Sequence, residues 1–204
     1  WTYRLRPAAA NPASLLLMLH GWTGDENSMG LFARSMPGQY AVLLPRGLYA
    51  APEGGYTWRE TIPGTWGLPS VESLLPAAEA VVGFLDDWSA VSSVDVSNFD
   101  VAGFSQGAAL AYTLALLFPR RVGRVAALSG FLPTGSEVRL EALEGKRIFI
   151  AHGRSDELIP IARARQAGVL LEKAGAQVSY CESAEGHKVG KECLKGMVTF
   201  FTIG

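Results

Sequence analysis

The sequence predicts an α/β fold in which a mostly parallel central sheet is covered by helices on both faces. Short apolar runs of strand length alternate along the chain with longer stretches that have helical periodicity. The order is strand then helix, repeatedly, which is typical of parallel sheets because each crossover between parallel strands needs a long connection. The 204 residues suit one compact unit, and we expect a single domain over residues 1–204.

The expected strands are short runs rich in leucine, β-branched or aromatic residues. They fall at residues 1–6, 15–19, 40–44, 99–102, 124–128, 147–151 and 177–182, with the first at an edge of the sheet. The expected helices lie between them, at residues 28–35, 71–88, 106–117, 161–174 and 191–201. Pro119 and Gly175 act as stop signals for two of these helices.

Residues 47–69 interrupt this alternation with a stretch that is rich in glycine and proline and carries Trp58 and Trp66. Long loops inside compact domains are usually functional, so we favour a loop that faces the substrate. The alternative is a surface loop whose tryptophans only attach it to the body of the protein. No block elsewhere is long enough to form a large helical lid over an active site.

Composition limits the class of partner. Hydrophobic residues make up 49% of the chain, charged residues 18%, and the net charge is −1, so nothing indicates binding to nucleic acid or to an anionic membrane. No apolar run approaches the roughly 20 residues of a membrane-spanning helix. We expect a cytoplasmic protein without stable membrane insertion that acts on a small molecule, and a homodimer is compatible with these features.

The two cysteines, Cys181 and Cys193, do not form a zinc-ligand pattern. Two free thiols are the favoured interpretation, and a bridge that closes the loop around His187 is the alternative. We therefore expect no metal site, and the chemistry proposed below needs no cofactor.

The segment from Gly103 to Gly107 reads Gly-Phe-Ser-Gln-Gly and joins a predicted strand to a predicted helix. In a sharp strand-to-helix turn the central serine is strained, and neighbouring chain comes too close for side chains two positions before and after it. The turn holds Ser105 above the sheet edge as a nucleophile, at the positive end of the following helix. The alternative is a glycine-rich turn whose serine merely caps the helix.

A serine hydroxyl is a weak nucleophile and needs a base, and three histidines are available. In this architecture the chain order is nucleophile, acid, base, which excludes His20 because it precedes Ser105. His152 stands only four residues before the candidate acid, too close for the two to arrive on separate loops. His187, between the last strand and the last helix, is therefore the expected general base.

The acid that orients the base should follow the penultimate strand, where Asp156 stands. It would hold one imidazole nitrogen as a donor and stabilise the imidazolium that forms during the reaction. Glu157 is the nearest competitor, and Glu182 or Glu185 could substitute by position. Asp156 as a simple helix cap ahead of Pro160 is the structural alternative.

An oxyanion hole needs two backbone donors that converge on one point. The amide of Gln106, directly after the nucleophile, is the first, and we expect the amide of Trp22, in the loop after the first buried strand, to be the second. His20 would help to hold that loop. Trp22, Trp58, Trp66 and Phe104 are the expected apolar walls of the substrate pocket.

Four motifs in order carry a resemblance to a known family. They are Leu19-His20-Gly21, the Gly103–Gly107 segment, the run from His152 to Asp156 with Ile159-Pro160, and Gly186-His187. From about residue 14 onward the chain resembles the phospholipase/carboxylesterase group of α/β-hydrolases, which includes the acyl-protein thioesterases. The resemblance implies the α/β-hydrolase fold, the triad of Ser105, Asp156 and His187, and oxyanion donors at Trp22 and Gln106.

The expected activity is that of a serine carboxylesterase that hydrolyses short- to medium-chain esters through an acyl-serine intermediate. Trp22 stands where members of the family often carry a smaller apolar residue, which narrows the expected acyl pocket. The alternatives are an acyl-protein thioesterase, a lysophospholipase, or a non-catalytic binding protein with the same fold.

Overall fold

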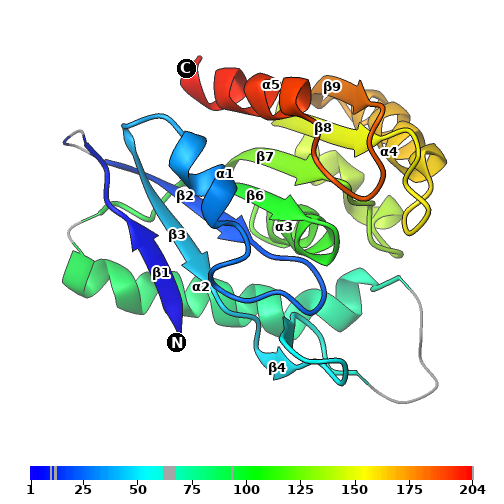
Figure 1. Ribbon diagram of the computed structural model, residues 1–204. Coiled ribbons are helices and arrows are strands. Elements are labelled where there is room, and N and C mark those ends of the chain that lie inside the picture. Colours follow the sequence, from blue (N-terminus) through cyan, green and yellow to red (C-terminus); the bar gives the residue numbers. More distant parts are fainter. Residues whose placement is uncertain (10, 12, 62–67, 93, 204) are drawn as a thin grey trace.

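A seven-stranded sheet forms the centre of the protein (Figure 1). The computed structural model describes residues 1–9, 11, 13–61, 68–92 and 94–203. The strand order is β1-β3-β2-β6-β7-β8-β9; β1 is antiparallel to β3 and the other pairs are parallel. The strands are β1 (Tyr3–Arg6), β2 (Ser14–Leu19), β3 (Tyr40–Pro45), β6 (Phe99–Phe104), β7 (Val122–Leu128), β8 (Arg147–Gly153) and β9 (Gln177–Ser183).

Helices cover both faces of this sheet (Figure 1). One face carries α2 (Val71–Ser92), α3 (Gln106–Leu117), α4 (Ile161–Lys173) and the short 3₁₀ helix η1 (Glu137–Leu143), and the other carries α1 (Gly30–Ser35) and α5 (Lys191–Thr202). Strand β2 is apolar from Leu15 to Leu19 without alternation because both of its faces are packed. The α/β fold predicted from the alternating pattern is confirmed, and each predicted strand and helix overlaps an observed one.

The described residues of the segment 47–69 include regular structure, which the sequence did not predict. It contains the small hairpin β4 (Tyr49–Ala50) and β5 (Tyr56–Thr57), which lies outside the main sheet. The Tyr56 amide donates to the Gly24 carbonyl at 2.8 Å, so the hairpin is attached to the loop that follows β2. Strands of two residues give no periodic signal in a sequence, which is why this hairpin was not predicted.

The parallel strands point in one direction, so the loops that follow β2, β6, β8 and β9 all lie at the carboxyl ends of the strands. These are the loops that carry the residues predicted to act together. Among the described residues, no helix is long and apolar enough to cross a membrane.

Candidate active site

Ser105 stands at the sharp turn between β6 and α3. Its backbone angles are φ 53° and ψ −114°, a conformation that is strained for a residue with a side chain. The flanking glycines permit the turn: a Cβ at Gly103 would lie 2.0 Å from the Gly107 carbonyl oxygen, and a Cβ at Gly107 would lie 2.2 Å from that of Leu19. The backbone strain therefore lies on Ser105, as the glycine spacing predicts.

His187 and Asp156 meet beside this turn on the loops after β9 and β8. The distance from His187 Nδ1 to Asp156 Oδ2 is 2.8 Å, and the Asp156 side chain is fully buried. The other oxygen of the carboxylate, Oδ1, accepts bonds from the amides of Leu158 at 3.0 Å and Ile159 at 2.9 Å. Of the competing acids, Glu182 is engaged by Arg165 at 2.8 Å.

The electrostatics of Asp156 keep it ionised. Burial by itself would raise the pKa of this carboxyl, but the hydrogen bonds from the Ile159 amide and from His187 outweigh burial and hold the pKa below its ordinary value. An anion therefore faces Nδ1 of His187, which makes Nδ1 the donor and leaves Nε2 of a neutral ring as the acceptor.

A ring contact places His187 beside the end of β6. The Phe104 and His187 rings lie 5.0 Å apart between centroids, and Phe104 directly precedes Ser105. The His187 loop is held against the Asp156 loop by the Ser155 amide, which donates to the Glu185 carbonyl at 3.1 Å. The structure thus brings Ser105, Asp156 and His187 to one edge of the sheet from three separate elements.

The loop after β2 lies against the same serine. A Cβ built on Gly21 would be 3.3 Å from the Ser105 Cβ, so the next residue, Trp22, lies close to Ser105. Within the described part of the chain, neither the Trp22 amide nor the Gln106 amide donates to another protein group. Both N–H groups remain available for an oxyanion.

A cavity of about 540 Å³ opens between these loops. Trp22 and Phe104 line it together with His187. The other apolar side chains that line it are Met29, Leu31, Phe32, Val189 and Leu194. Sequence reasoning missed these five, because their apolar character predicts burial without indicating a cavity.

The expectation for Trp58 is corrected by the structure. Trp58 is fully buried, does not line the cavity, and donates its indole N–H to the His20 carbonyl at 2.8 Å. An apolar side chain with one donor is as well satisfied in the core as in a pocket wall, and here the core position is taken. Trp66, the other tryptophan of this segment, lies outside the described residues.

The two remaining histidines are structural neighbours of the site. His20 donates from Nδ1 to the Gly21 carbonyl at 2.7 Å and accepts at Nε2 from the Gly47 amide at 2.8 Å, so it holds the loop after β2. His152 Nε2 lies 2.8 Å from the Ile159 carbonyl and 3.3 Å from Asp156 Oδ2. Sequence reasoning missed this second contact to Asp156, although the spacing of four residues was visible.

The preference for free thiols is also corrected. Cys181 on β9 and Cys193 on α5 form a disulfide, with their Cα atoms 5.6 Å apart. The bridge closes the segment that carries His187, which is the alternative that the spacing left open. Sequence spacing alone could not decide it, because bridging depends on the distance between two elements that pack only in the folded protein.

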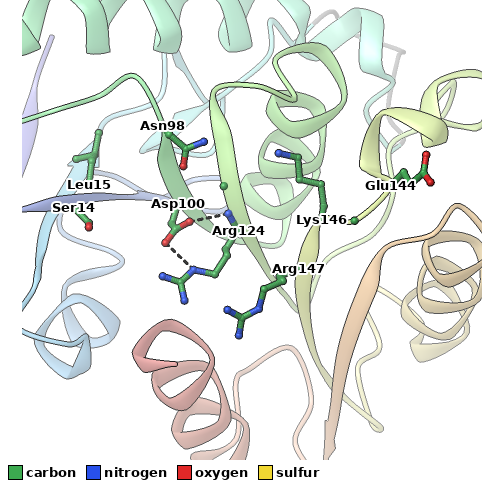
Figure 2. A pocket seen from close by; sticks show the side chains of 10 residues that line it. Ser14, Leu15, Asn98, Asp100, Arg124, Glu144, Lys146 and Arg147 are labelled. Atoms are coloured by element: carbon green, nitrogen blue, oxygen red, sulfur yellow. Dashed lines mark hydrogen bonds and ion pairs between the residues drawn. The ribbon is translucent and has the colours of Figure 1, made fainter. Parts of the chain in front are cut away.

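A second cavity, of about 530 Å³, lies at the opposite end of the sheet (Figure 2). Three of the charged groups that line it have partners. Asp100 accepts from Arg124 Nε at 3.0 Å and from the Tyr40 hydroxyl at 2.6 Å, and Arg147 donates to the Ile203 carbonyl at 2.9 Å. The bond from Arg147 ties the end of α5 to the sheet. Among the described residues no cluster of His, Cys, Asp or Glu could hold a metal ion.

Comparison with known proteins identifies the family of this chain. The family model described as phospholipase/carboxylesterase matches residues 5–203. The chain belongs to the phospholipase/carboxylesterase family. This assignment confirms the resemblance drawn from the four motifs and the α/β-hydrolase fold that it implies.

Members of the family with different descriptions are similar to this chain. A probable carboxylesterase of Oryza sativa is 34% identical over 139 residues, which cover 65% of this chain and 52% of that protein. A probable inactive carboxylesterase of the same species is 34% identical over 112 residues, covering 53% of this chain and 45% of that protein. Acyl-protein thioesterase 1 of Candida albicans is 26% identical over 138 residues, which cover 64% of this chain and 60% of that protein.

The chain spans about half the length of the first curated relatives that it matches, 53% and 52%. Among solved structures, a carboxylesterase of Mesorhizobium loti superposes with a TM-score of 0.84 at 25% identity, covering 99% of this chain and 94% of that one.

Proposed function

We propose that this chain is a serine carboxylester hydrolase with Ser105 as nucleophile, His187 as general base and Asp156 as the acid that orients the base. One observation carries the proposal: a buried, ionised carboxylate accepts a 2.8 Å hydrogen bond from an imidazole at the rim of an apolar cavity, beside a strained serine. A serine that only capped a helix would need neither the strain nor the paired histidine.

The reaction would proceed in two halves. The Ser105 hydroxyl oxygen attacks the ester carbonyl carbon while His187 Nε2 takes the hydroxyl proton. The oxyanion that forms accepts hydrogen bonds from the Trp22 and Gln106 amides. Collapse of the tetrahedral intermediate breaks the bond to the alcohol oxygen, and His187 gives that oxygen its proton, leaving an acyl-Ser105 ester.

In the second half, water hydrolyses the acyl-Ser105 ester through the corresponding steps. His187 accepts a proton from the attacking water, a second oxyanion forms in the same place, and collapse releases the carboxylic acid as the proton returns to Ser105. Asp156 stays ionised throughout and stabilises the imidazolium in both halves. The residues named here suffice for hydrolysis without a cofactor.

We propose short- to medium-chain esters as substrates, because the cavity of about 540 Å³ is lined mainly by apolar side chains and Trp22 occupies one wall. Each methylene that the cavity buries adds about 0.8 kcal/mol of binding until the wall is met. Thioesters are the second candidate, favoured by the relatives described as acyl-protein thioesterase 1. The same triad cleaves either bond.

The disulfide bears on the cellular compartment that we propose. Disulfides rarely persist in the cytosol, so the Cys181–Cys193 bridge supports an oxidising compartment over the cytoplasm that composition suggested. Quantifying free thiols in protein purified under non-reducing conditions tests this directly. Two reactive thiols per chain would instead favour the cytoplasm.

A serine-directed fluorophosphonate tests the catalytic proposal. We expect stoichiometric labelling of Ser105 in the wild type, no labelling of Ser105→Ala, and a loss of kcat by several orders of magnitude in that variant with a nearly unchanged melting temperature. Folded wild-type protein that neither labels nor hydrolyses p-nitrophenyl esters would instead be a binding protein, as the description of the inactive rice relative illustrates.

A further inference from the structure

Trp58 is the largest of the fully buried side chains in the described protein, and it sits behind the site instead of in it. Its indole N–H donates to the His20 carbonyl at 2.8 Å, and its ring lies 4.9 Å from the His20 ring. His20 stands two residues before Trp22, whose amide is one of the two proposed oxyanion donors. The indole therefore fixes the backbone that leads to this donor.

The same short segment also holds the second donor. The Trp58 backbone N–H donates to Gln106 Oε1 at 3.0 Å, and Gln106 Nε2 donates to the Thr57 hydroxyl at 2.9 Å. Because the Trp58 amide can only donate, it fixes which end of the Gln106 side chain is oxygen. The side chain of Gln106 is thus held in a buried position, and the backbone amide of the same residue is the second proposed donor.

The two proposed donors lie on different elements. The Trp22 amide belongs to the loop after β2 and the Gln106 amide to the first turn of α3. Trp58 hydrogen-bonds the His20 carbonyl in the first of these elements. Thr57 and Trp58 both hydrogen-bond the side chain of Gln106 in the second. Oxyanion stabilisation depends on donors at about 2.7–3.1 Å from one point. A buried group that hydrogen-bonds both elements therefore adds to their direct packing in setting this geometry.

We propose that Trp58, supported by Thr57, is a positioning residue that sets the separation of the two oxyanion donors without touching substrate. This inference rests on the proposed function. Loss of one oxyanion donor typically costs about 100- to 1,000-fold in kcat, and a donor displaced but still present should cost less, about 10- to 100-fold. Ground-state binding should barely change, because Trp58 does not line the cavity.

The test is Trp58→Phe, which removes the indole N–H and keeps most of the apolar bulk. Trp88→Phe, at a buried tryptophan of α2, is the matched control for lost volume. We expect kcat for a p-nitrophenyl ester to fall about 10- to 100-fold in Trp58→Phe with KM within about twofold. Trp88→Phe should retain wild-type kcat, and melting temperatures of both variants report on folding.

A trifluoromethyl ketone separates positioning from a general structural effect, because its adduct with Ser105 places an oxyanion between the two donors. Its inhibition constant should weaken in Trp58→Phe by the same factor as kcat falls. An unchanged kcat, or a fall in kcat without weaker inhibition, would overturn the inference.

A second pair of variants covers the case in which Trp58→Phe fails to fold. Thr57→Val removes the hydroxyl that holds Gln106, and Thr57→Ser restores it. We expect lower kcat and weaker ketone inhibition in the first and recovery in the second. Equal values for the two would also overturn the inference. If the wild type itself neither labels with fluorophosphonate nor hydrolyses esters, the proposed function fails, and that outcome is distinct from a failure of Trp58.

Discussion

Opening the Cys181–Cys193 bridge should lower the free energy of unfolding by about 3 kcal/mol, because the bridge restricts the unfolded chain. The cysteines are 12 residues apart, and the entropy of closing a loop of that length gives this value at 25 °C in the chain-entropy description. For a chain of about 200 residues, each kcal/mol corresponds to about 2–4 °C, so the melting temperature should fall by about 6–12 °C.

The assay compares thermal unfolding of the wild type with and without a phosphine reductant, beside the double variant Cys181→Ser, Cys193→Ser. The double variant should melt at the temperature of the reduced wild type and should not respond to the reductant. Esterase activity at 25 °C should fall less than stability, since the Ser155 amide still ties the His187 loop to its neighbour. A melting temperature that changes by less than about 2 °C would refute the reasoning.

Three further predictions concern the site. Gly107→Ala places a Cβ 2.2 Å from the Leu19 carbonyl oxygen, so it should lower the free energy of unfolding by about 1–3 kcal/mol and also lower kcat. Urea unfolding and ester hydrolysis measure the two effects, and no change in either would mean that the turn relaxes freely. The pKa of Asp156 is held below its ordinary value, so its contribution to stability is complete above about pH 4 and is lost as pH falls further. Urea midpoints from pH 7 to pH 2 should therefore decline more steeply in the wild type than in Asp156→Asn. Trp22→Ala should shift the preferred acyl chain in a series of p-nitrophenyl esters to longer lengths, whereas Trp58→Phe should leave the preferred length unchanged. An unchanged preference in Trp22→Ala would exclude Trp22 as a wall of the acyl pocket.

Local sequence decided the turn at Ser105 and the order of the elements. The Gly103–Gly107 spacing reflects clashes between atoms a few residues apart or on the adjacent strand, so the pentapeptide alone carries the signal. Apolar periodicity places strands and helices because burial on one or both faces repeats along the chain. Position after a given strand then predicts which loops meet, and Asp156 and His187 were found in this way.

Contacts between distant segments were decided only by the tertiary structure. Apolar character indicates that Trp22 and Trp58 leave water, but it does not say which lines a cavity and which fills the core. The Cys181–Cys193 bridge depends on how α5 packs on β9. The two-residue strands that present Trp58 have no periodicity to read. The sequence by itself therefore determined the fold class and the order of the candidate triad, since both follow from local sterics and one-dimensional pattern. The walls of the pocket, the bridge and the support behind the oxyanion donors arise from packing in three dimensions, which no single segment encodes.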